Sequence, residues 1–157
     1  MRTTDNGGGT SRSSLPPRGT VLGFDFGTAP IGVAVAELEL GIAHPLETVR
    51  STDEATRDRA LDRLVREWRP VVLVIGLPES RDGRTHPLAE VIGRWAESLG
   101  QRHGVPVRFE DESFTSAQAS SSLNENGIRG MKQKRHLDTV AAQHILQAFL
   151  ESRNETA

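Results

Sequence analysis

Three carboxylates stand in stretches of the sequence that are otherwise apolar. Asp25 lies inside the run VLGFDF, Glu112 closes VPVRFEDE, and Asp138 opens HLDTVAAQHILQAFL. A buried acid is unfavourable unless a cation compensates its charge. Three acids on three separate core elements therefore favour one shared site that holds a divalent metal ion.

Asp25 and Asp138 each allow a structural alternative. Gly23 shares the strand face of Asp25 and predicts open space beside it, although an Asp before a glycine turn is also common in hairpins. On a helix, Asp138 lies three and four residues before Ala141 and Ala142, in the stripe that faces the sheet. The alternative is an acid that interacts with the helix dipole. The two small alanines favour a close approach of this helix to the sheet.

Glu112 belongs to a cluster of acids. It shares strand parity with Glu110, whereas Asp111 points to the opposite face, so only part of the cluster can reach one site. A solvated strand end is the alternative interpretation.

The expected chemistry follows from these ligands. Oxygen ligands in a chain without cysteine favour Mg²⁺ or Mn²⁺, which activate water for in-line hydrolysis of a phosphodiester. Lys132, Lys134 and Arg135 would hold the phosphate oxygens of a nucleic acid. A solvated loop with a pairing between Lys134 and Asp138 is the alternative.

Composition limits the possible classes of protein. The 157 residues (17.1 kDa) fit one domain, and the absence of cysteine excludes disulfides, thiolate zinc sites and cysteine nucleophiles. The net charge of −2 requires any phosphate contact to be local, and 4% aromatic residues disfavour base stacking as the main mode of binding. The first residues contain no signal-like apolar stretch, and no apolar run is long enough to span a membrane, which predicts a cytoplasmic protein.

The pattern of elements predicts an α/β fold, ribonuclease-H-like, with a mixed five-stranded sheet and helices on both faces. Residues 1–19 read as a disordered tail, 20–152 as one nuclease domain and 153–157 as a short C-terminal tail. Three short strands precede the first helix, which stops at Pro70. Then come the interior strand 71–76, a helix over 88–103, a strand over 105–110, a helix over 115–127, a basic loop and a helix over 137–152.

Five segments in order resemble motifs of the YqgF (RuvX) family of bacterial proteins: GFDFGTAPIGVAV, VVLVIGLPESRDG, HPLAEVIGRWAESL, FEDESFTSAQA and LDTVAAQHILQAFL. The resemblance covers nearly everything from 20 to 150. It implies a fold related to the RuvC Holliday junction resolvases and a cytoplasmic nuclease that matures the 5′ end of precursor 16S ribosomal RNA. The family acids correspond to Asp25, Glu112 and Asp138. In the resolvases one acid lies on the strand after the first helix, where this chain has none, so Glu112 would substitute from the next strand.

The chain also departs from the family pattern. Ala29 and Pro30 replace basic residues expected after the DxG turn, and Ser113 replaces an arginine of the acidic motif. These changes remove positive charge near the proposed site, so phosphate binding would be weaker or carried by 129–135.

Three alternatives to a precursor-RNA nuclease stay open. Holliday junction DNA is the nearest other substrate, and two symmetric cuts would favour a homodimer, whereas a monomer suffices for RNA. A catalytically weak RNA-binding assembly factor, associated with ribosomal particles, would explain the missing basic residues. The DFGT turn also resembles that of the actin and sugar-kinase folds, but the chain has only half of that ATP-binding apparatus.

Overall fold

The computed structural model describes residues 15–26, 30–50, 53–78, 87–111 and 130–156, and it places the side chains of the last helix from 139 to 153. This part of the chain forms the following strands and helices: β1 (Thr20–Asp25), β2 (Ile31–Glu37), β3 (Ala43–Val49), α1 (Glu54–Trp68), β4 (Val72–Leu77), α2 (Pro87–His103), β5 (Val107–Asp111) and α4 (Gly130–Thr156). The helix expected over 115–127 lies outside the described residues.

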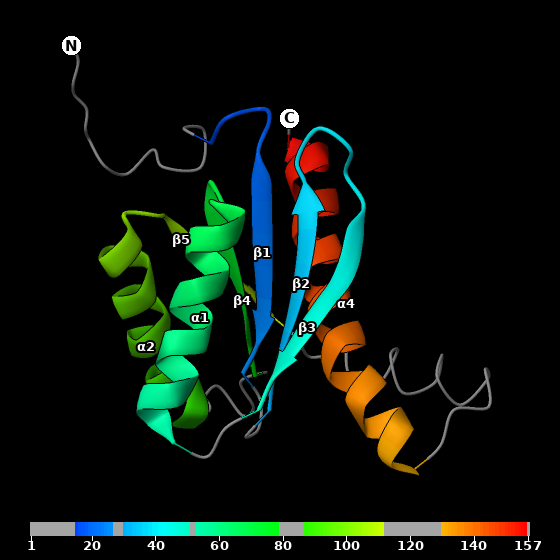
Figure 1. Ribbon diagram of the computed structural model, residues 1–157. Helices are drawn as coiled ribbons and strands as arrows, with labels where there is room; N and C mark the ends of the chain where they lie inside the picture. The colour runs from blue at the N-terminus through cyan, green and yellow to red at the C-terminus, as the bar shows by residue number, and fades with distance from the viewer. Residues whose placement is uncertain (1–14, 27–29, 51–52, 79–86, 112–129, 157) are drawn as a thin grey trace.

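The strands form one mixed sheet in the order β3-β2-β1-β4-β5. β1, β2 and β3 pair antiparallel, while β4 joins β1 and β5 joins β4 in parallel. α1 and α2 cover one face of the sheet and α4 covers the other (Figure 1). This arrangement confirms the predicted ribonuclease-H-like architecture and makes β1 the middle strand.

Large apolar side chains fill the space between the sheet and the helix pair α1 and α2. The largest fully buried members of this first core are Leu22, Phe24, Ile31, Leu61, Leu64, Leu73, Ile75 and Leu99. α1 begins at the N-cap Asp53, whose carboxylate accepts a hydrogen bond from the Thr56 amide at 3.0 Å. It ends at Arg69, which adopts a left-handed conformation (φ 48°) just before Pro70, as the sequence predicts.

A second core of smaller side chains lies under α4. The strands contribute Val21, Ala34, Ala36, Ala43, Val72 and Val74, and the helix contributes Ala142, Ile145, Leu146, Phe149 and Leu150. α4 is longer than predicted, because it begins at Gly130 and runs to Thr156. The prediction of a basic loop over 129–135 was wrong from residue 130 onward, because Met, Lys, Gln and Arg are all good helix formers.

Two contacts involve residues next to the ends of the described chain. Leu15 packs against the second core, and the Arg153 guanidinium donates a hydrogen bond to the Pro16 carbonyl at 3.2 Å. Leu15, Pro16 and Arg153 therefore contact the rest of the domain or one another.

The outer edge of β3 is held by two glutamines of α4. Gln147 accepts a hydrogen bond from the Ala43 amide at 2.9 Å and donates to the Gly41 carbonyl at 3.1 Å, and Gln143 donates to the Ala43 carbonyl at 3.0 Å. These contacts replace the neighbouring strand that an edge strand lacks.

None of the helices in the described residues is both long enough and apolar enough to cross a membrane.

Candidate metal and nucleic-acid site

Asp25 is the last residue of the middle strand. It pairs with Gly32 on β2 and with Gly76 on β4, and the same row continues to Thr48 on β3 and Glu110 on β5. Paired residues of a sheet project from the same face. The row therefore crosses the whole sheet with the Asp25 carboxylate at its centre, on the side that α4 covers.

The two glycines beside Asp25 are the feature that sequence reasoning missed. Gly32 and Gly76 carry no side chain, so the residues paired with Asp25 place no side chain next to its carboxylate. In the sequence, each of these glycines follows an isoleucine, in 31–32 and in 75–76. This pattern becomes meaningful only when the register places both glycines opposite the acid.

The predicted open space beside Gly23 is filled by α4. A Cβ built on Gly23 would lie 2.9 Å from the Cβ of Leu146 and 3.5 Å from the Ala142 carbonyl oxygen. That interpretation was therefore wrong, since the glycine admits a helix and not a ligand. The predicted close approach of this helix to the sheet is confirmed, because the helix backbone itself reaches β1 at Ala142.

Position 138 lies one helical turn before Ala142. α4 runs antiparallel to β1, so its earlier turns extend toward the edge at which β1 ends (Figure 1). Residue 138 thus occupies the stripe of α4 that meets the sheet, displaced toward Asp25. The side chain of Asp138 lies outside the described residues, as does Glu112, which follows the last residue of β5.

The three predicted phosphate-binding residues, Lys132, Lys134 and Arg135, lie on the first two turns of α4. Their backbone is helical where a loop was expected, and their side chains lie outside the described part of the structure. Their role stays a prediction.

Glu110 is the described acid that shares the row and face of Asp25. The two residues are separated by two strand spacings, or about 10 Å. Partial burial, and secondarily the charge of Asp111, raises the pKa of the Glu110 carboxyl above its usual range. Asp111 pairs with Leu77 and alternates to the opposite face, as its parity predicts.

The residue after Asp25 is anchored on the other face of the sheet. The ring of Phe26 packs edge-on against Trp95 of α2, with their centroids 4.2 Å apart. The Trp95 indole donates a hydrogen bond to Asp58 of α1 at 3.2 Å, and the Arg57 guanidinium lies 5.3 Å from its ring centroid. This cluster ties the end of the middle strand to both helices.

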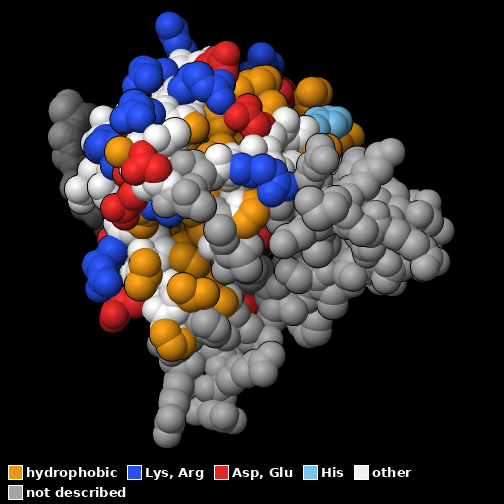
Figure 2. Space-filling view, turned by 60° about the horizontal axis from the view of Figure 1, so that its bottom comes forward, with side chains coloured by type: hydrophobic (Ala, Val, Ile, Leu, Met, Phe, Trp, Pro, Cys, Tyr) orange, Lys and Arg blue, Asp and Glu red, His pale blue; other side chains and the backbone are white. Residues whose placement is uncertain are grey.

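The positive ends of three helix dipoles point to the same edge. α1, α2 and α4 all begin at the end of the molecule where β1 and β4 terminate (Figure 1). Figure 2, in which this end is turned forward, shows Arg side chains interspersed with Asp and Glu. Arginines of α1 and α2 form the ion pairs Arg57–Glu54, Arg94–Glu90 and Arg102–Asp62. The helix dipoles favour the approach of a polyanion to the edge that carries Asp25.

Within the described residues, no three His, Cys, Asp or Glu side chains gather in a way that could hold a metal ion. The donor chemistry nevertheless fits a hard divalent cation. Asp25 supplies a carboxylate flanked by glycines, and positions 112 and 138 carry the other two carboxylates of the predicted set. The absence of cysteine disfavours softer metals.

Residues 19–152 match the protein family described as "RuvX: Holliday junction resolvase". The chain belongs to the RuvX family. A RuvX relative in Nitrosospira multiformis, named "Putative pre-16S rRNA nuclease", is 46% identical over 145 residues, which cover 92% of this chain and 96% of the relative. A protein of the same name in Methylobacillus flagellatus is 48% identical over 134 residues, with 85% and 92% covered.

Solved structures of resolvases share the fold of this RuvX chain. RuvC of T. thermophilus in complex with a Holliday junction substrate superposes with a TM-score of 0.54 at 22% identity, covering 88% of this chain and 98% of RuvC. The Holliday junction resolvase of fowlpox virus gives a TM-score of 0.55 at 15% identity, covering 85% and 99%. At such identities these structures support the ribonuclease-H-like fold alone.

Proposed function

We propose that this RuvX protein is a metal-dependent nuclease that trims the 5′ end of precursor 16S ribosomal RNA in the cytoplasm. The observation that carries the proposal is the placement of Asp25 at the end of the middle strand, between two glycines, on the face that α4 approaches at Ala142. The names of the relatives at 46% and 48% identity supply the substrate.

The roles of the residues follow from their positions. Asp25, Glu112 and Asp138 would hold Mg²⁺ or Mn²⁺ as carboxylate ligands. The bound cation would supply activation of water and stabilisation of the leaving oxygen. Lys132, Lys134 and Arg135 would orient the phosphate backbone from the first turns of α4, where their charge and the helix dipole act on the same anion.

The decisive experiment compares wild type with Asp25→Asn. The substrates are a 16S precursor mimic with a 5′ extension and a four-way DNA junction, each with Mg²⁺ and with EDTA. We expect the substitution to lower cleavage on the order of 1000-fold, because the site loses a charged ligand worth several kcal/mol of transition-state stabilisation. Thermal unfolding should be essentially unchanged, and equal cleavage by both proteins would refute the metal site.

The acidic cluster of β5 provides an internal control. Glu112→Gln should reduce cleavage strongly, whereas Asp111→Asn, on the opposite face, should leave it intact. If Glu110→Gln proves more damaging than Glu112→Gln, the ligand from β5 is the residue in the row of Asp25.

Holliday junction DNA is the second candidate substrate. The family description names a Holliday junction resolvase, and the fold matches resolvase structures at TM-scores of 0.54 and 0.55. Paired cuts in the DNA junction together with a dimer in solution would favour this substrate. Cleavage of the RNA mimic by a monomer would favour precursor ribosomal RNA. Binding of RNA or of ribosomal particles without turnover in either metal would identify an assembly factor.

A further inference from the structure

We propose that Arg50 binds a backbone phosphate of the nucleic-acid strand, next to the phosphodiester that is cleaved. This inference rests on the proposed function, because it assigns the flanking part of the same substrate. It supplies positive charge at the edge where Ala29 and Pro30 have replaced the basic residues expected after the β1 turn.

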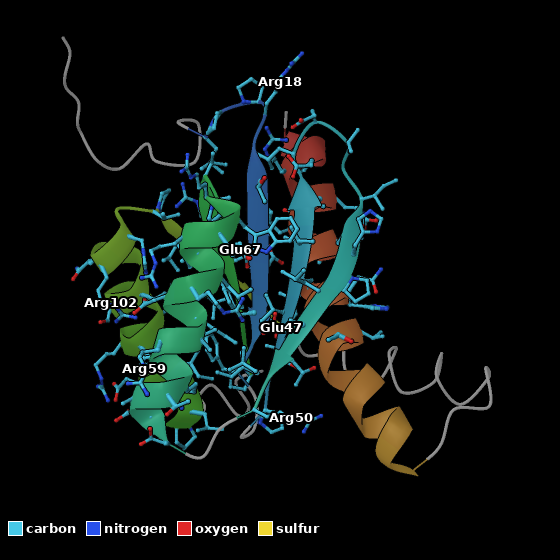
Figure 3. The ribbon with its side chains drawn as sticks, viewed as in Figure 1. Arg18, Glu47, Arg50, Arg59, Glu67 and Arg102 are labelled. Atoms are coloured by element: carbon cyan, nitrogen blue, oxygen red, sulfur yellow. The ribbon has the colours of Figure 1, made fainter. Side chains whose placement is uncertain are left out.

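The register of the sheet places Arg50 at the catalytic edge. Val49, the last residue of β3, pairs with Ile31, one residue from the pair formed by Gly32 and Asp25. Arg50 therefore leaves β3 at the end of the sheet where β1 also terminates. Figure 3 shows Arg50 at this end, just below the end of β3.

Strand parity places Arg50 on the same side of the sheet as Asp25. Thr48 pairs with Gly32 and so shares the face of Asp25, whereas Glu47 points to the other face, where its carboxylate binds the Arg63 guanidinium of α1 at 2.9 Å. Arg50 follows the last residue of β3, and continuing the alternation of the strand one residue beyond Val49 would bring it to the Asp25 side. Its side chain is exposed at this surface.

The separation of the two residues distinguishes a binding role from a chemical one. Two strand spacings across the sheet and two residues along it give about 12 Å between the Cα atoms of Asp25 and Arg50. A guanidinium cannot share a metal ion with a carboxylate, and this distance keeps it away from the reacting phosphodiester. The Arg50 guanidinium can nevertheless reach a nucleic-acid strand that passes over Asp25. Its planar set of N–H donors matches the oxygens of a phosphate.

The strand that precedes Arg50 is held firmly. Val49 is 4% exposed and belongs to the first core, and Gln147 and Gln143 fix the start of β3 against α4. A charge presented from a fixed strand costs less conformational entropy on binding than one on a mobile segment. Arg50 therefore follows directly on a backbone position, Val49, that is fixed before substrate arrives.

The test measures RNA binding without cleavage. In an Asp25→Asn background, a fluorescent hairpin RNA with a single-stranded 5′ extension is titrated at several salt concentrations against three proteins: the background itself, the background with Arg50→Gln, and the background with Arg66→Gln. Arg66 is an exposed arginine in the last turn of α1, at the opposite end of the molecule. We expect Arg50→Gln to weaken binding about 10-fold and to lower the slope of log K against log salt by about 1.

The Arg66→Gln control should leave both quantities unchanged, and Arg50→Lys should retain the salt slope because the charge remains. With Asp25 intact, Arg50→Gln should raise KM about 10-fold at constant kcat. An unchanged salt slope, or a loss confined to kcat, would overturn the proposal.

The proposal and the nuclease assignment can fail separately. A reduced slope in a protein whose wild type does not cleave would keep the phosphate site and refute the nuclease. Cleavage by wild type with no effect of Arg50→Gln would refute the phosphate site alone. No binding of RNA by any of the proteins would refute both.

Discussion

The face of the sheet under α1 and α2 is filled by leucine, isoleucine and phenylalanine, whereas the face under α4 is lined by valine, alanine and glycine. On the first face, bulky side chains keep the helices at a distance and exclude water. On the second face, Gly23 and Ala142 let the helix backbone touch the strand. The face with less apolar volume is the one that carries Asp25.

The difference separates stability from chemistry. Burial of large side chains contributes most of the hydrophobic stabilisation, and it tolerates small shifts of a helix. A site made of ligands from a strand and from a helix needs their separation fixed closely, which contact between small residues provides. Changes on the two faces should therefore affect stability and activity in different proportions.

The largest effect on stability should come from Leu61→Ala, which opens a cavity in the first core. Leu61 is fully buried, so we expect a loss of about 3 kcal/mol in the free energy of unfolding, measured by urea denaturation. Cleavage by the folded protein should persist. Leu61→Met, which nearly conserves volume, should cost less than about 1.5 kcal/mol.

Gly23→Ala should affect cleavage more strongly than Leu61→Ala does, although it should cost less stability. The added Cβ would lie 2.9 Å from the Cβ of Leu146, so α4 must move away from β1. We expect a loss of about 2 kcal/mol in stability together with a loss of cleavage larger than that of Leu61→Ala. The matched control is Gly93→Ala on α2, where the added atom meets open space and should stabilise the helix by about 0.5 kcal/mol. Full cleavage by Gly23→Ala would contradict the distinction between the faces.

The smallest effect should come from an ion pair outside both cores. Asp62 of α1 binds the Arg102 guanidinium at 2.9 Å and the His103 ring at 2.7 Å on α2. Partial burial pushes the pKa of Asp62 upward, but the hydrogen bonds from His103 and Arg102 outweigh it and hold the pKa below its usual range.

A carboxyl with a lowered folded-state pKa stabilises the protein above its unfolded pKa, and this contribution is lost as the pH falls through the folded value. Asp62→Asn should therefore lower stability by less than about 1 kcal/mol near neutral pH and by less still in acid. Cleavage should not change. The measurement is chemical denaturation of wild type and Asp62→Asn over a pH series. A difference in unfolding free energy that does not change with pH would contradict the lowered pKa of Asp62.

Much of the fold could be predicted because its signals are local. The apolar run of β4, the helical spacing of Leu61, Leu64 and Val65, and the stop at Pro70 each lie within a few residues. The start of α4 was missed because the charges of 130–136 suggested a loop, although those residues favour a helix.

The candidate site was harder to predict because it depends on register. That Gly32 and Gly76 flank Asp25, and that Glu110 shares their row, follows from pairing between strands far apart in the sequence. The same is true of Gly23, whose empty face is occupied by a helix more than 100 residues later. The assignments of Glu112 and Asp138 stay predictions.

The glutamine contacts that close the edge of β3 have a consequence for synthesis. They join Gly41 and Ala43 to Gln143 and Gln147 across 100 to 106 residues. A ribosome therefore releases the β1–β3 meander long before the helix that covers it. During that interval the nascent chain exposes an open strand edge and a bare alanine-rich face, both prone to aggregation. Substitutions that weaken α4 should accordingly make expression of the protein depend more on chaperones than substitutions that weaken α1.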